Sequence, residues 1–87
     1  MNNIIRLCEI AIGESAEVWE LKNEAAMRRR LCDLGLIEGT TLQCVGISPT
    51  GDPHAYLIRG AVIAIRNRDA GAVLVSPLAE KGALAWD

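Results

Sequence analysis

Aromatic residues are scarce in this sequence, and phenylalanine is absent. The 87 residues include two tryptophans and one tyrosine, 3% of the chain, whereas 51% of the residues are hydrophobic. A core of this composition has to be aliphatic, built from isoleucine, leucine, valine and alanine. Disordered proteins are typically far less apolar, because they bury too little hydrophobic surface to fold. The length predicts a single small domain spanning 1–87.

Long hydrophobic runs are also missing. A transmembrane helix needs about 20 consecutive apolar residues, and the longest candidate run is bracketed by Arg59 and Arg66. The N-terminal segment lacks the basic-then-apolar order of a signal peptide, because Arg6 and Glu9 interrupt it. These absences predict a soluble, cytoplasmic protein that does not insert into a membrane.

Cysteine and positive charge are limited in ways that exclude further classes. Cys8, Cys32 and Cys44 are an odd number of thiols, and none lies in a Cys-x-x-Cys motif. A disulfide framework is therefore not expected, and a reducing compartment fits. Nine basic and eleven acidic residues give a net charge of −2. Nucleic-acid-binding domains typically present a basic face, so no nucleic-acid partner is predicted.

Apolar periodicity predicts about five short strands. Residues 14–22 alternate in hydrophobicity, with Ala16 and Val18 on one side and Trp19 and Leu21 on the other, which is typical of a strand. Four later strands are predicted at 40–47, 54–60, 61–66 and 72–76, with a turn or one turn of helix at 67–71 and no assigned element in 78–87.

One helix is predicted at about 23–34. Asn23 suits the N-cap position, and Gly35 suits the left-handed conformation that often follows the last turn of a helix. On a helical wheel, three apolar side chains at i, i+4 and i+7 form a narrow stripe flanked by Arg28 and Arg30. The stripe consists of Met27, Leu31 and Leu34, and the residues predicted to point away from it are Arg29, Cys32 and Asp33.

The predicted fold class is mainly β. The segments between most of the strands are too short for parallel crossovers, so the strands pair as antiparallel neighbours. A sheet with so few strands avoids exposed edges by curling into a barrel. We therefore predict a small antiparallel barrel with the helix inserted after its first strand. The core is expected to contain Val18, Ile63, Ile65, Val73 and Val75, with Met27, Leu31 and Leu34 closing it from the helix.

The segment "SPTGDPH" (48–54) raises the question of a catalytic or phosphate-binding loop. Its two prolines and its glycine exclude regular structure. It lacks the GxxxxGK[ST] pattern of a phosphate loop, so we predict a hairpin turn. His54 is then expected to be an ordinary polar residue at the start of the next strand.

No metal site and no catalytic set are predicted. A metal ion needs several ligands at suitable spacing. The candidate ligands besides His54 are Cys8, Cys32 and Cys44, which are scattered along the sequence. Acyl transfer requires a nucleophile beside a base, and the sequence offers no such pair. We therefore predict a protein that is not an enzyme and carries no cofactor.

The densest cluster of one charge is the triplet Arg28, Arg29 and Arg30. A basic stretch on a helix is most often a solvated face. Alternatively the triplet binds an acidic partner, since arginine is favoured at protein interfaces. Binding of proline-rich peptides is not favoured, because it needs an aromatic-lined groove and the only aromatic residues are Trp19, Tyr56 and Trp86.

Two segments, "RRLCDLGLIEGTTLQCV" (29–45) and "SPTGDPHAYLIRGAVIAIRNRDAGAVLV" (48–75), carry a recognisable pattern. The first is a helix end of the form RL-x-x-LGL followed by Gly39 and Thr40. The second contains a Gly-Asp-Pro loop, a strand that ends at Gly60, and a further apolar strand. On these residues the sequence resembles the FeoA family, the small cytosolic component of the bacterial ferrous iron uptake system.

The resemblance covers roughly residues 5 to 77. The sequence departs from the family pattern at Glu38, where proline is common, and at Ile65, where leucine is common. The resemblance implies an SH3-like barrel and a non-enzymatic accessory role in ferrous iron transport, through contact with the cytosolic G domain of the FeoB membrane transporter. The alternative is a metal-sensing or metal-binding SH3-like module, related to the C-terminal domain of iron-dependent repressors.

Overall fold

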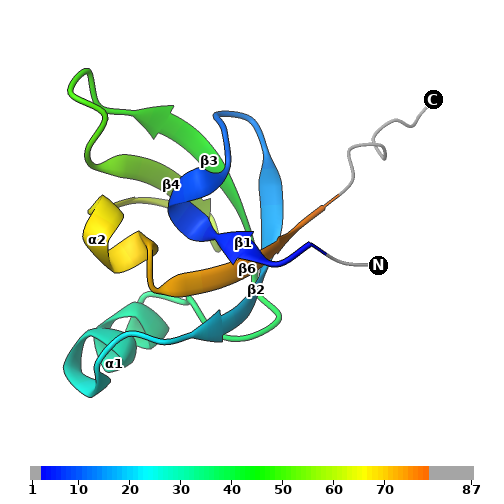
Figure 1. Cartoon of the computed structure of the whole chain (residues 1–87), viewed down its shortest axis with the longest axis vertical. Coiled ribbons are helices and arrows are strands. Elements are labelled where there is room, and N and C mark those ends of the chain that lie inside the picture. The colour runs from blue at the N-terminus through cyan, green and yellow to red at the C-terminus, as the bar shows by residue number, and fades with distance from the viewer. Residues whose placement is uncertain (1–2, 79–87) are drawn as a thin grey trace.

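The structure is a computed structural model that describes residues 3–78 (Figure 1). Residues 79–87, which include Trp86, lie outside the described residues. The described part contains six strands, two helices and one 3-10 turn, in the order β1 Ile5–Arg6, η1 Leu7–Glu9, β2 Ser15–Leu21, α1 Ala25–Asp33, β3 Thr41–Ile47, β4 His54–Ile58, β5 Ala61–Ile65, α2 Asn67–Ala70 and β6 Val73–Pro77. Within residues 3–78, neither helix has the length and hydrophobicity that a membrane span requires.

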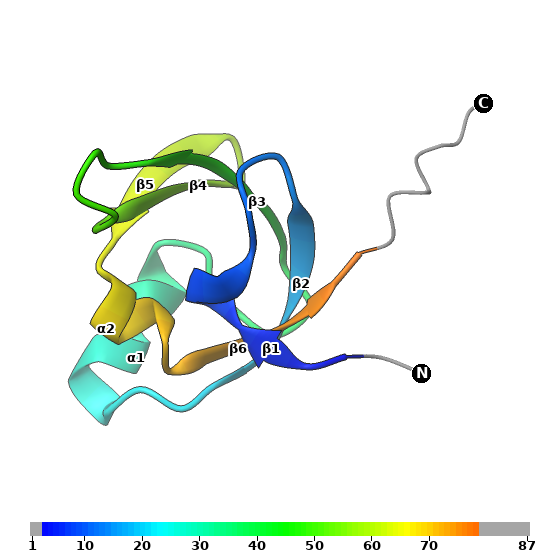
Figure 2. The same ribbon diagram turned by 45° about the horizontal axis from the view of Figure 1, so that its top comes forward.

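All six strands belong to one antiparallel sheet, in the order β1-β6-β2-β3-β4-β5. The sheet curls round on itself, so that β4 and β5 lie across the barrel from β1 and β6 (Figure 2). The two helices lie together at one end of the barrel (Figures 1 and 2). The predicted mainly β fold, a small SH3-like antiparallel barrel, is confirmed.

The number of strands is six rather than the predicted five, because β1 is an additional strand of two residues. Ile5 pairs with Val75 and Arg6 pairs with Leu74, so β1 extends the sheet beyond β6. The sequence around β1 shows no clear alternation of apolar and polar residues. The strand forms because it pairs with β6, near the other end of the described chain. The helix therefore follows the second strand, not the first. Within the predicted turn at 67–71 lies the short helix α2.

The predicted facing of Leu21 in β2 is wrong. Ala16 and Val18 are buried and Trp19 is exposed, as predicted, but Leu21 is also buried. The pairing of β2 with β6 shifts between Val18 and Glu20, which is a bulge or local irregularity in the strand. Such an irregularity adds one residue to the strand and reverses the alternation beyond it, so Leu21 faces the core.

The predicted core is confirmed in most positions. Ile63 and Met27 are only partly buried and pack against the core from its edge. Leu34 is 44% exposed, so its predicted place in the core is wrong. The predicted residues that are buried are Val18, Leu31, Ile65, Val73 and Val75.

The end of α1 explains why Leu34 is outside the core. The Gly35 N–H donates to the Cys32 carbonyl (3.0 Å) and the Leu36 N–H donates to the Leu31 carbonyl (2.9 Å). This pair of bonds is the Schellman motif, and the φ of 107° at Gly35 confirms the predicted left-handed position. The turn carries Leu36 back onto Leu31, so Leu36 is buried instead of Leu34. Cys32, predicted to point outward, is partly buried against the core.

Asn23 is not the N-cap of α1, because the helix begins one residue later with Glu24 as the cap. The Asn23 side chain is buried, and its Nδ2 donates to the backbone oxygen of Asp69 at 2.9 Å. This bond joins the start of α1 to α2.

The loop between β3 and β4 is the predicted hairpin turn, and it is braced against α2. The Asn67 backbone N–H donates to Oδ1 of Asp52 at 2.9 Å, and Asn67 Nδ2 donates to the Gly51 carbonyl at 2.9 Å. The Asp52 carboxylate therefore satisfies a free N–H in the first turn of α2 from a distant part of the chain.

Asp52→Ala is expected to lower the free energy of unfolding by about 1 kcal/mol, the typical cost of losing a side-chain acceptor at a helix N-terminus. Asp52→Asn is the matched control, because its amide oxygen still accepts the Asn67 N–H. Chemical denaturation of the two variants checks this. Equal stability of Asp52→Ala and the wild-type chain would show that the bond contributes nothing.

Candidate protein interface

The three arginines predicted as a partner-binding cluster lie on α1, and all three are exposed. Successive residues of an α-helix are rotated by about 100°, so Arg28, Arg29 and Arg30 point in different directions. Arg28 turns toward the start of the helix, where its Nη1 lies 3.4 Å from the Asn23 carbonyl oxygen. The triplet is therefore not one continuous patch.

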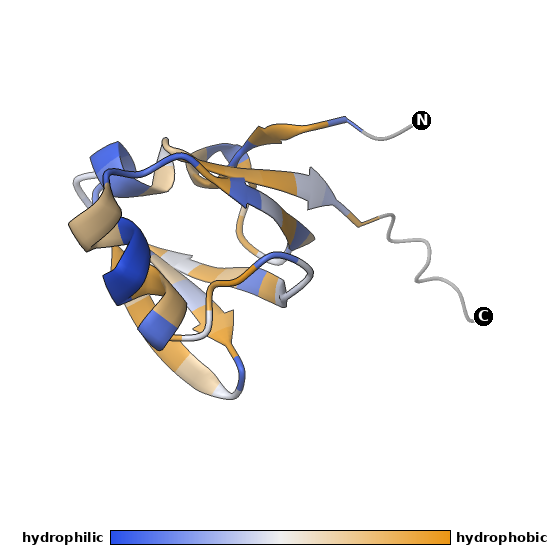
Figure 3. Cartoon of the chain, turned by 90° about the horizontal axis from the view of Figure 1, so that it is seen from below, coloured by the Kyte–Doolittle hydropathy of each residue, from blue (hydrophilic) through white to orange (hydrophobic). Residues whose placement is uncertain are grey.

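Arg30 lines a groove between α1, the end of β5 and α2, which we call the α1–α2 groove. The groove has a volume of about 270 Å³. Figure 3 shows strongly hydrophilic segments (blue) on both helices beside largely hydrophobic strands (orange). The residues that line the groove are Met27, Arg30, Leu31, Leu34, Ala64, Ile65, Arg66, Arg68 and Asp69.

The charge of the α1–α2 groove is positive. Arg30, Arg66 and Arg68 contribute three positive charges and Asp69 one negative charge, a sum of +2. Within residues 3–78 the one ion pair joins Arg6 to Glu9 at 3.2 Å, so none of the three groove arginines is paired with a carboxylate there. Sequence reasoning missed Arg66 and Arg68, which it placed at the end of a strand and in a turn.

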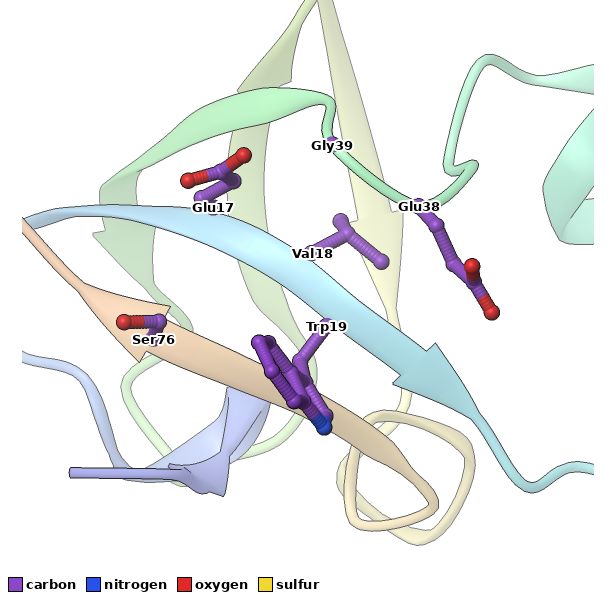
Figure 4. Close-up of a pocket in the computed structure, with 6 residues that line it drawn as sticks. All are labelled: Glu17, Val18, Trp19, Glu38, Gly39 and Ser76. Atoms are coloured by element: carbon purple, nitrogen blue, oxygen red, sulfur yellow. The ribbon is translucent and has the colours of Figure 1, made fainter. Parts of the chain in front are cut away.

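A second groove lies over β2 and carries the opposite charge. It has a volume of about 440 Å³ and is lined by Glu17, Val18, Trp19, Glu38, Gly39 and Ser76. Figure 4 shows the Trp19 ring over β6, with Glu17 on the other side of β2. Trp19 is 54% exposed, but Tyr56 is fully buried. A single exposed ring in the described part of the chain does not make the aromatic-lined groove that proline-rich peptides require.

A polar cluster lies inside the barrel around Tyr56. The Tyr56 hydroxyl lies 3.5 Å from the Leu7 carbonyl oxygen and 3.4 Å from Nδ1 of His54. Burial raises the pKa of Tyr56, and the nearby Cys44 and Cys8 thiols raise that pKa further. Burial also raises the pKa of Cys44. The Tyr56 hydroxyl and the Cys44 thiol therefore remain protonated at neutral pH.

His54 opens β4, at the predicted position, and its side chain is buried. It is 8% exposed, and its backbone pairs with Ile47 on one side and Ile65 on the other. In the part of the chain that the structure describes, no group of three or more histidine, cysteine, aspartate or glutamate side chains is placed to hold a metal ion.

Binding of ferrous iron or zinc is therefore expected to be weak, without saturation at one ion per chain. Anaerobic titration calorimetry with each metal checks this, and His54→Ala serves as the comparison because His54 is the sole histidine of the sequence. Tight stoichiometric binding by the wild-type chain that His54→Ala abolishes would contradict the prediction.

The FeoA domain family model matches residues 5–77. The chain belongs to the FeoA family. A relative of this FeoA-family chain is the Fe(2+) transport protein A/Fe(2+) transporter FeoB fusion protein of Porphyromonas gingivalis, which is 28% identical over 71 residues. The match covers 82% of this chain but only 8% of the fusion protein.

Solved structures of FeoA proteins have the same fold. The FeoA protein of Chlorobium tepidum is 35% identical, with a TM-score of 0.83 over 95% of this chain and 81% of that one. The FeoA of Stenotrophomonas maltophilia, described as an SH3 domain protein and solved with zinc, is 28% identical, with a TM-score of 0.73 over 82% of this chain and 88% of that one. These structures confirm the resemblance seen in the sequence.

The likeness to iron-dependent repressors is limited to the fold. The IdeR structure of T. acidophilum is 21% identical, and the match has a TM-score of 0.76 over 86% of this chain and 34% of the repressor. An identity this low carries the barrel architecture and no function. The metal-sensing alternative therefore gains no residue-level support from this comparison.

Proposed function

We propose that this FeoA-family chain is a non-enzymatic accessory protein of ferrous iron transport, and that it acts by contact with the cytosolic G domain of a FeoB-like membrane transporter. The observation that carries the proposal is the Porphyromonas gingivalis relative, in which the FeoA and FeoB parts form one chain. Covalent linkage holds two domains at an effective concentration that is about millimolar for short linkers. Where the two parts are separate chains, the same proximity requires an interface between them.

The arginines of α1 support a contact driven partly by charge. The chain is acidic overall, with a net charge of −2, yet Arg28, Arg29 and Arg30 are exposed together on one short helix. A local positive surface raises the rate of encounter with an acidic partner, and salt screens this effect. We therefore take the α1 side of the molecule as the face that meets the transporter.

The proposal is tested by co-precipitation of the chain with the soluble cytosolic part of the FeoB-like transporter from the same source. Retention of the chain at low salt and its loss as salt rises are the expected results. An unrelated acidic protein of similar size, immobilised in the same way, controls for non-specific adsorption. Absence of retention at low salt would contradict the proposal.

A further inference from the structure

The α1–α2 groove joins apolar surface to unpaired positive charge. Its floor includes Leu31 and Ile65, which are buried in the core, and its wall includes the half-buried Met27. Leu34 lines the groove and is 44% exposed, an uncovered apolar side chain at the end of α1. The groove therefore presents apolar side chains, chiefly Leu34 and Met27, within a lining that is largely polar and charged.

The open form of the groove favours the side chains of a docked protein segment over an enclosed small molecule. Small-molecule sites usually bury most of the ligand's surface. The rim residues of this groove, Arg30, Arg66 and Arg68, are exposed to solvent, so the groove is not a closed cavity. An open site of this size holds one or two side chains of a larger partner.

The charge of the rim specifies an acidic partner. Arg30, Arg66 and Arg68 surround the groove and none is paired with a carboxylate among residues 3–78. The like charges that line the groove repel one another, Asp69 offsets only one of the three, and carboxylates of a partner relieve the remaining repulsion. Arginine also binds a carboxylate through two parallel hydrogen bonds, which gives both strength and orientation.

The elements that carry these arginines are joined to one another. Asn23 Nδ2 donates to the Asp69 carbonyl at 2.9 Å and so ties the start of α1 to α2. The side chain of Asn67, at the start of α2, donates to the Gly51 carbonyl at 2.9 Å. A site whose walls are fixed before binding loses less conformational entropy on association.

We propose that the α1–α2 groove is the docking site for an acidic protein segment that inserts an apolar side chain beside Met27 and Leu34 and places carboxylates on Arg30, Arg66 and Arg68. This rests on the proposed function, in that the segment belongs to the cytosolic part of the FeoB-like transporter. Within the arginine triplet, Arg30 contacts the partner directly. Arg29 lies about 100° farther round the helix and acts only through its long-range charge.

Association and dissociation rates of charge-reversal variants distinguish these roles. Arg30→Glu and Arg29→Glu change the charge by the same amount on adjacent exposed positions of α1, so they are matched for electrostatic steering. Both variants are expected to slow association with the transporter's cytosolic part. Arg30→Glu, and likewise Arg68→Glu, should also raise the dissociation rate by about tenfold or more, because a direct charge contact is lost. Arg29→Glu should leave that rate within about twofold of wild type.

A synthetic helical peptide with a stripe of leucines flanked on both sides by glutamates tests the groove without the transporter. We expect it to bind the wild-type chain, to bind Leu34→Ser and Arg30→Glu at least about tenfold more weakly, and to bind Arg29→Glu nearly as well as wild type. Circular dichroism and thermal unfolding of each variant verify that it is folded. The corresponding peptide with lysines in place of glutamates should not bind.

The possible outcomes separate the groove from the proposed function. Equal dissociation rates for Arg29→Glu and Arg30→Glu, when the wild-type chain binds the transporter, overturn the groove and leave the proposed function standing. Peptide binding with the expected order of variants, without binding to the transporter, supports the groove chemistry and overturns the proposed partner. Failure of the peptide to discriminate between Arg29→Glu and Arg30→Glu also overturns the groove.

Discussion

Leu31→Ala is expected to lower the free energy of unfolding by about 2–5 kcal/mol, the usual cost of truncating a buried leucine. Leu31 is 3% exposed, and its carbonyl accepts the Leu36 N–H in the turn that ends α1. Removal of its side chain leaves a cavity in the core, to which Leu31 and Leu36 both belong. For a small domain, such a loss is a large share of the total stability of about 5–15 kcal/mol.

Leu34→Ala is the matched control for this prediction. It is the same substitution three residues along the chain, but at a side chain that is 44% exposed. Its expected cost is less than about 1 kcal/mol, in line with substitutions outside the core. Urea denaturation of both variants measures the difference. Similar losses for the two would mean that α1 is rotated relative to the orientation described above.

Gly35→Ala is expected to lower the free energy of unfolding by about 1–3 kcal/mol, because a residue with a Cβ is strained at a positive φ. The φ of Gly35 is 107°, and a Cβ at this position would lie 2.9 Å from Cδ of Arg59 and 3.4 Å from Cγ2 of Ile58. The backbone conformation therefore disfavours any side chain here, and the Arg59 side chain would have to move to make room for one.

Gly13→Ala separates these two causes. Gly13 has a φ of 93°, but a Cβ there would meet nothing within 4 Å, so its variant reports the backbone strain alone. Gly35→Ala is expected to be the more destabilised of the two in thermal or chemical unfolding. Unchanged stability of Gly35→Ala would contradict the left-handed turn at the end of α1.

The parts of the fold that the sequence predicted are those that local chemistry determines. The end of α1 at Gly35 follows from the need for a left-handed residue after a helix. The bend between β4 and β5 is a two-residue turn in which Arg59 and Gly60 both have positive φ. Such turns suit the twist of antiparallel strands and favour glycine, so Gly60 marked the bend correctly. The strand before it ends at Ile58, not at Gly60, because residues with positive φ leave the strand.

The parts that the sequence did not predict depend on contacts between distant segments. β1 exists through its pairing with β6, and Leu21 is buried through an irregularity in the pairing of β2 with β6. The candidate interface is another such case, since Arg66 and Arg68 follow β5 and reach α1 only when the barrel closes. The prediction treated Arg28, Arg29 and Arg30 as one cluster, whereas on α1 these side chains point in different directions.

The contact with the transporter is tested most directly by nuclear magnetic resonance of the isotope-labelled chain as the unlabelled G domain of the FeoB-like transporter is added. We expect the signals that shift first to belong to the α1–α2 groove, including the methyl groups of Met27 and Leu34, and these shifts to diminish as salt is raised. A spectrum that does not change at any ratio of G domain to chain, at low salt, would contradict this expectation.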